Sequence, residues 1–157
     1  MEGFTLAMLG MALVIVLGGV GSAVGVSISA QMASGVITEE PRKFGKMIPL
    51  VGIAGTQGFY SLLIGFLVMM KLKLLTGEPL TNIPMLNGAQ LLFICAPIGL
   101  VEMVSAIYQG KAAAAAIGIV AKREEEAGKA LILPAFVEVY AVLGLVAAFL
   151  LLNAVKV

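Results

Sequence analysis

The sequence predicts an all-α membrane protein with four transmembrane helices, arranged as a tandem duplicated hairpin. Of the 157 residues, 61% are hydrophobic and only 12% are charged, and the mean hydropathy is +1.09. Because about a quarter of the residues in a typical soluble domain are charged, these values favour a chain that lies within a bilayer. The spacing of the few charges predicts the helices, and a similarity between the two halves of the chain predicts the hairpins.

Four long apolar stretches mark the expected helices in turn, and each exceeds the roughly 20 residues that a helix needs to cross a bilayer. Residues 3–38 and 47–70 contain no charge. Between Glu78 and Lys111 the only charge is Glu102, and between Lys129 and Lys156 it is Glu138. The first stretch lacks the basic leader of a secretory signal and is too long for a signal core, so we expect it to remain as a helix. The expected helices lie near 4–33, 47–74, 87–119 and 129–153.

Basic residues predict the orientation, because cytoplasmic loops carry an excess of Lys and Arg. The loops at 34–46 and 120–129 hold most of them and should face the cytoplasm, with both termini on the opposite side. The basic residues in or beside these loops are Arg42, Lys43, Lys46, Lys122, Arg123 and Lys129, against Lys71, Lys73 and Lys156 on the other side.

An internal repeat of roughly 80 residues divides the chain into a first transmembrane hairpin, 1–80, and a second, 81–157. Each half has a helix rich in Gly and Ala, a charged loop that ends in Gly-Lys, and a helix with a polar centre followed by an aromatic residue. Alignment on the aromatic residues places Gly58 opposite Glu138. Both hairpins have the same orientation, which differs from the inverted repeat of many transporters.

Small residues recur every four positions on the first and third helices and predict that these two pack tightly as an inner layer. The second and fourth helices should then form an outer layer. The two rows are Gly21, Gly25, Ser29 and Ala33, and Ala106, Gly110, Ala114 and Gly118.

Glu138 is the residue most informative about function, because it is the only charge in the last apolar stretch. An ionised side chain at mid-membrane costs about 2.5 to 3.5 kcal/mol on insertion scales, so this carboxylate should be neutralised or should bind a cation. The alternative is a protonated Glu with a purely structural role in a helix interface. Pro134, four residues earlier, is expected to bend the helix near Glu138.

Several kinds of site are excluded by composition. The chain has no His and a single Cys95, which leaves zinc and copper without their usual ligands and leaves no disulfide. Its Gly-Lys pairs lack the glycine spacing and the following Ser or Thr of a phosphate-binding loop, so no nucleotide site is expected. We therefore predict a chain that is not itself catalytic and has no nucleic-acid partner.

A set of polar side chains should converge on one depth of the membrane. Gln57, Gln109 and Glu138 each lie about 10 to 12 residues, or on the order of 15 to 18 Å, from the cytoplasmic loops. Together with Thr56 they would offer a hydroxyl, two amide oxygens and a carboxylate to a hard alkali ion or a proton. Tyr60, one turn after Thr56, should reach the carboxylate; the alternative is an interfacial or packing aromatic residue.

Three motifs in the chain resemble those of the V-type ATPase proteolipid, the subunit that forms the rotor ring. The likeness covers essentially the whole chain and is greatest to proteolipids of bacterial sodium-translocating enzymes. The motifs are Gly55-Thr56-Gln57-Gly58 with Tyr60, Tyr108-Gln109-Gly110-Lys111, and Phe136-Val137-Glu138-Val139-Tyr140.

The resemblance implies a homo-oligomeric ring in a bacterial cell membrane that turns against a membrane stator subunit with an arginine. It also implies an ion site made by Glu138, Gln109, Gln57, Thr56 and the backbone carbonyl of Ile53, with Tyr60 bonded to Glu138. Sodium is the expected ion, because this site has more oxygens than a proton needs; a proton is the alternative. Membrane lipid surrounds the ring, a central-stalk subunit should dock on the charged loops, and no cofactor is expected besides the transported ion.

Glu102 lies outside these motifs, and Lys111, although part of one, has no expected role in ion binding. Glu102 is open to three interpretations: a protonated residue bonded to a neighbouring helix, a residue in a wet ring interior, or an accessory ion site. The role of Lys111 is left open. Two other functions compete with the rotor: a small proton-coupled secondary transporter that uses Glu138, and a structural pore-forming or junction protein.

Overall fold

The computed structural model describes residues 2–156, which form four apolar helical segments long enough to cross a membrane. The first is α1 (Glu2–Glu39). The second runs through η1 (Pro41–Lys43), α2 (Phe44–Gly52), η2 (Ile53–Gly55) and α3 (Thr56–Lys71). The third is α4 (Met85–Lys122), and the fourth comprises η3 (Glu124–Glu126), α5 (Ala127–Ala130) and α6 (Ile132–Ala154). No strand occurs over this range, which confirms the all-α prediction.

The first helix extends beyond its expected end at residue 33 and stops only at Glu39. The extra turns contain polar residues that were expected in a loop. The hydroxyl of Ser34 donates to the carbonyl of Gln31 at 2.8 Å, and that of Thr38 donates to the carbonyl of Ser34 at 2.8 Å. Because these hydroxyls bond to their own helix, they are satisfied without ending it.

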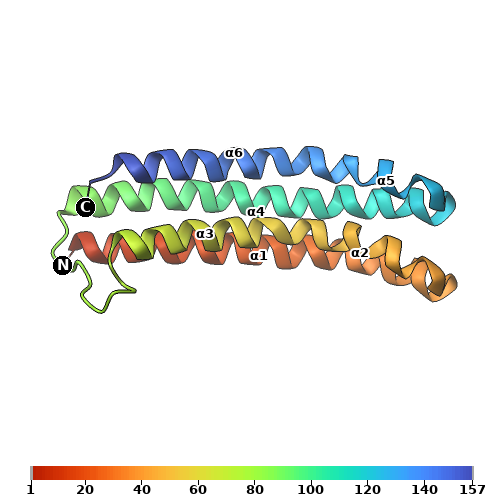
Figure 1. Cartoon of the computed structure of the whole chain (residues 1–157), viewed down its shortest axis with the longest axis horizontal. Coiled ribbons are helices and arrows are strands. Elements are labelled where there is room, and N and C mark those ends of the chain that lie inside the picture. The colour runs from red at the N-terminus through yellow and green to blue at the C-terminus, as the bar shows by residue number, and fades with distance from the viewer. Residues whose placement is uncertain (1, 157) are drawn as a thin grey trace.

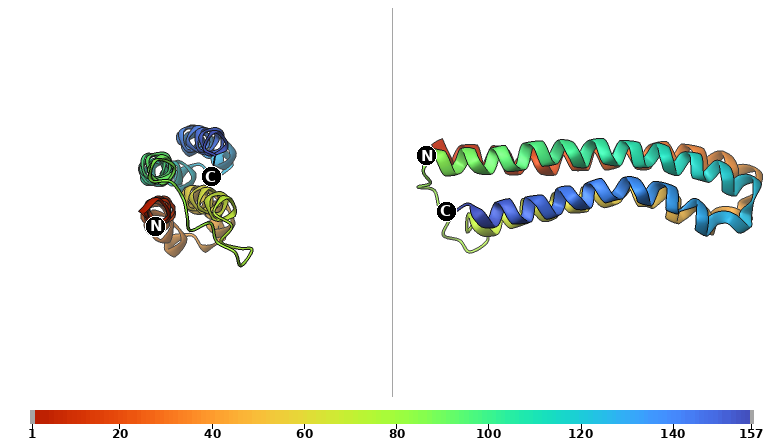
Figure 2. Two further views of the ribbon diagram at one scale, coloured as in Figure 1. Left: turned by 90° about the vertical axis from the view of Figure 1, so that its left-hand side faces the viewer. Right: turned by 90° about the horizontal axis from the view of Figure 1, so that it is seen from above.

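The helices form two layers, as the right-hand view of Figure 2 shows. One layer contains α1 and α4, which run in the same direction, and the other contains α3 and α6, which run in the opposite direction (Figure 1). Both described ends of the chain lie at one end of the bundle, together with the connection between α3 and α4. The loops around η1 and η3 lie side by side at the other end (Figure 1).

Glycines allow the backbones of α1 and α4 to touch. A Cβ atom added to Gly110 would lie 2.2 Å from the carbonyl oxygen of Gly25, and one added to Gly21 would lie 2.5 Å from Cα of Met103. No side chain fits at such distances, so glycine is required at both positions. The predicted tight packing of the first and third helices is therefore confirmed.

The small-residue row on α4 does not continue as predicted. Beyond Gly110 the buried positions are Ala113, Ala116, Ile117 and Val120, whereas Ala114 and Gly118 are only partly buried. An α-helix has 3.6 residues per turn, so a strict four-residue repeat rotates about 40° with each step. The row therefore turns toward the edge of the contact with α1, where a Cβ on Gly118 would lie 3.6 Å from Cε of Met32.

Both segments of the second layer are interrupted near a proline. In the first hairpin, the helical segment that contains Pro49 ends at Gly52 and a 3₁₀ turn follows. In the second, α5 ends at Ala130 and α6 begins at Ile132, just before Pro134. Proline has no N–H to donate, which weakens the helix in the preceding turn and accounts for the break before Pro134, whereas the 3₁₀ turn of the first hairpin follows its proline. Figure 2 shows that this layer bows along its length, as expected near Pro134.

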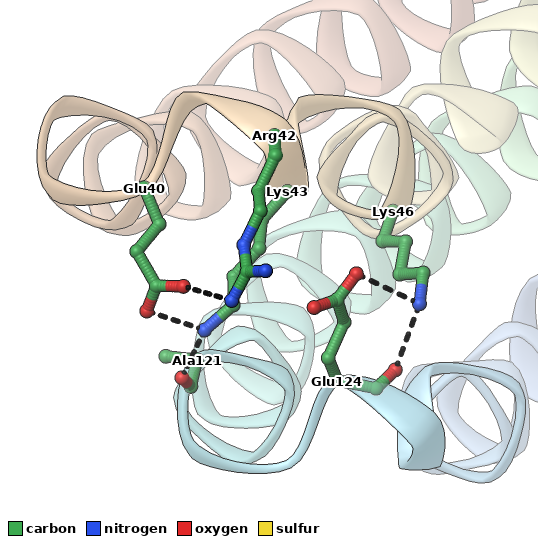
Figure 3. A network of polar contacts seen from close by, with 6 residues as sticks. All are labelled: Glu40, Arg42, Lys43, Lys46, Ala121 and Glu124. Atoms are coloured by element: carbon green, nitrogen blue, oxygen red, sulfur yellow. Dashed lines mark hydrogen bonds and ion pairs between the residues drawn. The ribbon is translucent and has the colours of Figure 1, made fainter.

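Polar contacts join the two loops at the end that holds η1 and η3 (Figure 3). The Nζ of Lys43 lies 2.6 Å from Oε1 of Glu40 and donates to the carbonyl of Ala121, also at 2.6 Å. Lys46 pairs with Glu124 at 3.0 Å across the two hairpins. Lys43 is buried and satisfies one of the free carbonyls at the end of α4. The hairpins are thus fastened together at the loop end.

Candidate functional site

The apolar interior of the bundle is interrupted by a polar layer. One cluster of buried apolar residues lies toward the chain ends and includes Val14 and Ile64, and a second lies toward the loops and includes Met47 and Ile117. Between them, several polar side chains are buried, notably Gln57 and Gln109, both with no exposed surface. Buried amides are costly without hydrogen bonds, so each should have partners.

Glu138 lies beside this layer on α6 and is held by two neighbouring side chains. The hydroxyl of Tyr60 donates to Oε1 of Glu138 at 2.7 Å, and the amide Nε2 of Gln109 lies 3.5 Å from Oε2. The carboxylate is half-buried. It borders a surface hollow of about 330 Å³ between α3 and α6, which gives it a route to the outer face of that layer. The lining residues are Tyr60, Ala135, Glu138, Val139, Val142 and Leu143.

The two glutamines connect three helices. Nε2 of Gln57 donates to Oε1 of Gln109 at 2.6 Å, and Nε2 of Gln109 donates to the carbonyl of Pro134 at 3.1 Å. Proline at 134 also interrupts the helix, so the same residue shapes α6 and accepts a bond from the site. Gln109 therefore presents its NH₂ group, not its oxygen, toward Glu138.

Thr56 brings in a backbone oxygen from the irregular segment before α3. Its hydroxyl lies 3.0 Å from the carbonyl oxygen of Ile53 and 3.3 Å from Oε1 of Gln57. Ile53 begins the 3₁₀ turn η2, where hydrogen bonds span three residues instead of four. Such a turn within a long helix redirects carbonyl groups, so Ile53 and Thr56 can face the same point.

The structure brings together all six residues that the resemblance implied, joined by a chain of hydrogen bonds from Ile53 to Tyr60. The set is Ile53, Thr56, Gln57, Tyr60, Gln109 and Glu138. Its chemistry is hydroxyl, amide, carbonyl and carboxylate oxygen, which suits hard cations better than soft metals. One negative charge with neutral oxygens around it can neutralise a monovalent cation or hold a proton.

Sequence reasoning missed Ser105. Its hydroxyl lies 3.4 Å from Nε2 of Gln57 and donates to the carbonyl of Val137 at 3.2 Å, so it links α3, α4 and α6. Ser105 precedes Gln109 by four residues and shares its helix face. That spacing was visible in the sequence and could have identified it.

Glu102 and Lys111 lie outside this set. Glu102 is fully buried, and neither of its carboxylate oxygens has a hydrogen-bond partner among the described residues. Lys111 is exposed on α4, with its Nζ 4.7 Å from the ring centre of Tyr108, a cation–π distance. Neither side chain contacts Glu138 in the hydrogen bonds and ion pairs found between residues 2 and 156.

Comparison with known proteins adds independent findings. The model of the ATP synthase C-subunit family matches the chain twice, at residues 9–68 and 92–151. A protein of Enterococcus hirae named V-type sodium ATPase subunit K is 40% identical over 153 residues, which cover 97% of this chain and 94% of that protein. A protein of Methanocaldococcus jannaschii named A-type ATP synthase subunit K is 31% identical over 147 residues, 94% of this chain and 61% of that protein.

The two matched segments also bear on the internal repeat. They begin at 9 and 92, a separation of 83 positions, and α1 and α4 begin at 2 and 85, the same separation. Applied without gaps, this offset pairs Glu138 with Gly55, whereas the aromatic residues had suggested Gly58. In either register the first hairpin has a glycine where the second has the carboxylate.

Proposed function

Because the chain belongs to the ATP synthase C-subunit family, we propose that it is the rotor-ring proteolipid of a V-type or A-type ATPase and that Glu138 carries its transported ion, sodium. The chain is an integral membrane protein, and the family implies a ring of identical copies. The observation that carries the site assignment is the convergence of Tyr60, Gln109 and Gln57 around the half-buried carboxylate.

Each site residue has a distinct task in this proposal. Glu138 supplies the charge that balances the cation, and Thr56 with the carbonyl of Ile53 supplies oxygens from α3 and η2. Gln57 and Gln109 supply amide oxygens. Since Gln109 presents its NH₂ group to Glu138, sodium binding would require its amide to turn by half a rotation and exchange its partners.

Neutralisation explains how ion binding is coupled to rotation. A carboxylate with a bound cation is electrically neutral and can pass through lipid as the ring turns, whereas an empty carboxylate would bear the cost of burial. Glu138 would load an ion from one half-channel and release it into another, where an arginine of the stator subunit displaces it. The hollow beside Glu138 would be the entry route on the outer face.

The oxygen ligands around Glu138 suit sodium better than a proton. A proton needs one carboxyl group and one neighbour, which Glu138 and Tyr60 alone would provide. The additional oxygens of Thr56, Gln57 and Ile53 exceed what a proton needs and match a larger cation, which requires several oxygen ligands. The Enterococcus hirae relative, a sodium ATPase subunit by name, supports the same choice.

The loop end of the bundle would face the cytoplasm and meet a central-stalk subunit. It carries the basic residues that define a cytoplasmic side. The contacts between the loops, which are the Lys46–Glu124 ion pair and the hydrogen bond from Lys43 to the carbonyl of Ala121, would hold both hairpins in one fixed surface for that partner (Figure 3).

Carbodiimide modification of the purified ring tests this proposal, because the reagent reacts with a protonated, accessible carboxyl group. At fixed pH, sodium should slow modification of Glu138, while potassium at equal ionic strength should not. The Glu138→Gln variant is the control, because it shows how much modification occurs at other residues. Modification that follows pH and ignores sodium would overturn the sodium assignment and indicate a proton site.

A further inference from the structure

Two polar side chains in the middle of the bundle have no partners. Glu102 on α4 and Ser61 on α3 are both fully buried, and neither the Glu102 oxygens nor the Ser61 hydroxyl forms a hydrogen bond with any described residue. Buried polar groups are rarely left in this state. The pair plays no part in the hydrogen-bond chain around Glu138.

Both residues lie at the same level of the bundle. Gln57 on α3 bonds to Ser105 on α4, and these two helices run in opposite directions. One turn beyond Gln57 is Ser61, and about one turn before Ser105 is Glu102, so the pair forms the next polar level toward the chain ends.

Glycines of the other two helices complete this level. A Cβ atom added to Gly144 of α6 would lie 3.2 Å from Oε1 of Glu102. One added to Gly18 of α1 would lie 1.8 Å from Oγ of Ser61. Each of the four long helices therefore contributes one residue to this level, and the glycines of α1 and α6 supply no side chain that could bond to Ser61 or Glu102.

None of the ion pairs found between residues 2 and 156 involves Glu102. On the surrounding helices, α1 has no charged residue between Glu2 and Glu39, and Tyr60 of α3 is bonded to Glu138 of α6. On α4 itself, Cys95 lies seven residues before Glu102, is buried among apolar side chains and supplies no positive charge.

The basic residues of these helices are remote from this level. Lys111 is exposed and directed to Tyr108, nine residues from Glu102 along α4. Lys71 lies ten residues beyond Ser61, in the last turn of α3. An ionised Glu102 would therefore be an uncompensated charge in the membrane interior, which is strongly unfavourable.

We propose that Glu102 and Ser61 form a second, interior binding site whose ligand is a proton. Glu102 holds the proton and is neutral, and Ser61 is its hydrogen-bond partner after a side-chain rotation or through one buried water. Sodium is a poor ligand here, because the pair offers only three side-chain oxygens and lacks the amides of the Glu138 site. This site goes beyond the function proposed for Glu138 and does not depend on which ion Glu138 carries.

The proton at Glu102 should stay in place as the ring turns. Toward the chain ends, the next level consists of buried apolar residues, including Val14, Ile64 and Ile98. Glu102 itself has no exposed surface, in contrast to the half-buried Glu138. The buried polar residues therefore end at the level of Glu102, and the proton held there is retained and not transported.

Infrared spectroscopy of the purified ring tests the proposal, because a protonated carboxyl group has a C=O stretching band apart from the amide bands. Saturating sodium at neutral pH keeps Glu138 ionised. A protonated carboxyl band should persist under these conditions, remain in Glu138→Gln, and disappear in Glu102→Gln. Absence of the band from the unmodified ring, or its survival in Glu102→Gln, would overturn the proposal.

A second variant covers the case in which Glu102→Gln fails to assemble. Ser61→Ala removes the proposed partner and should shift the Glu102 band to higher frequency, while Ser34→Ala, at an exposed position of α1, should leave it unchanged. No shift in Ser61→Ala would show that Ser61 is not the partner. Sodium binding to the Glu138→Gln ring is a further test: none is expected, and one ion per protomer would show that Glu102 binds sodium instead of a proton.

Discussion

The hydroxyl of Tyr60 donates a 2.7 Å hydrogen bond to Oε1 of Glu138, although the two residues are 78 positions apart and belong to different hairpins. Neither hairpin alone contains both the carboxylate and its tyrosine. The bond joins α3 to α6 at the outer face, beside the hollow that exposes the carboxylate. We interpret it as the contact that holds Glu138 in its closed position.

Removal of that hydroxyl should weaken ion retention. In Tyr60→Phe, Glu138 loses a bond to a charged group, which contributes about 1.5 kcal/mol or more, so the sodium concentration for half-maximal protection from carbodiimide should rise about tenfold. The matched control is Tyr140→Phe on α6, because Tyr140 is exposed and forms no hydrogen bond to Glu138. Equal effects of the two variants would contradict a specific role for Tyr60.

The two glutamines should act as a unit. Gln57→Ala and Gln109→Ala each remove a ligand, and each also breaks the 2.6 Å bond between the two amides. The loss of sodium affinity in the double variant should therefore be smaller than the sum of the single losses by about 1 kcal/mol, roughly a factor of five. A control cycle pairs Gln109→Ala with Gln31→Ala, at an exposed glutamine on α1, and should be additive. Additivity in both cycles would show that the Gln57–Gln109 bond does not matter for binding.

The sequence contained enough to predict which side chains meet. Long stretches with at most one charge located the four helices, and a constant rise of about 1.5 Å per residue placed Gln57, Gln109 and Glu138 at one depth. That calculation needs only helix geometry and a common starting plane. It succeeds because regular helices in a bilayer convert sequence distance directly into depth.

Irregular backbone was the part that could not be predicted. The 3₁₀ turn at Ile53–Gly55 and the break at Leu131 depend on how prolines and glycines are packed, and sequence spacing does not encode that. The orientation of the Gln109 amide likewise depends on the carbonyl of Pro134, a partner on another helix. The complete burial of Glu102 without a hydrogen-bond partner among the described residues likewise depends on how the helices pack.

Close contact between α1 and α4 should make Gly110 intolerant of any side chain. In Gly110→Ala, the new Cβ would lie 2.2 Å from a backbone oxygen of Gly25, so the helices must separate, at a cost of about 1 to 3 kcal/mol. Gly35→Ala is the control, because nothing lies within 4 Å of a Cβ at that position of α1, and alanine should be neutral or up to about 1 kcal/mol stabilising there. Thermal unfolding of the purified ring, followed by circular dichroism, measures both. A ring that tolerates Gly110→Ala as well as Gly35→Ala would contradict the packing.

The ion pair between Lys46 and Glu124 should make the loop end sensitive to acid. The hydrogen bond from Lys46 lowers the pKa of Glu124, so the folded loop favours the ionised carboxylate. A lowered folded-state pKa contributes stability above the ordinary carboxyl pKa, and that contribution is lost as pH falls through the lower value.

Hydrogen exchange of the amides in η3 and α5 can measure this loss, with the parent chain and Lys46→Gln compared at each pH. Protection should be greater in the parent at neutral pH, and the difference should vanish in acid and shrink at high salt, which screens exposed charges. Lys122→Gln, at an exposed position that forms none of the ion pairs found between residues 2 and 156, should behave like the parent. A difference that persists unchanged in acid would mean that Lys46 stabilises the loop by its contact with the Glu124 carbonyl, at 3.4 Å, and not by charge.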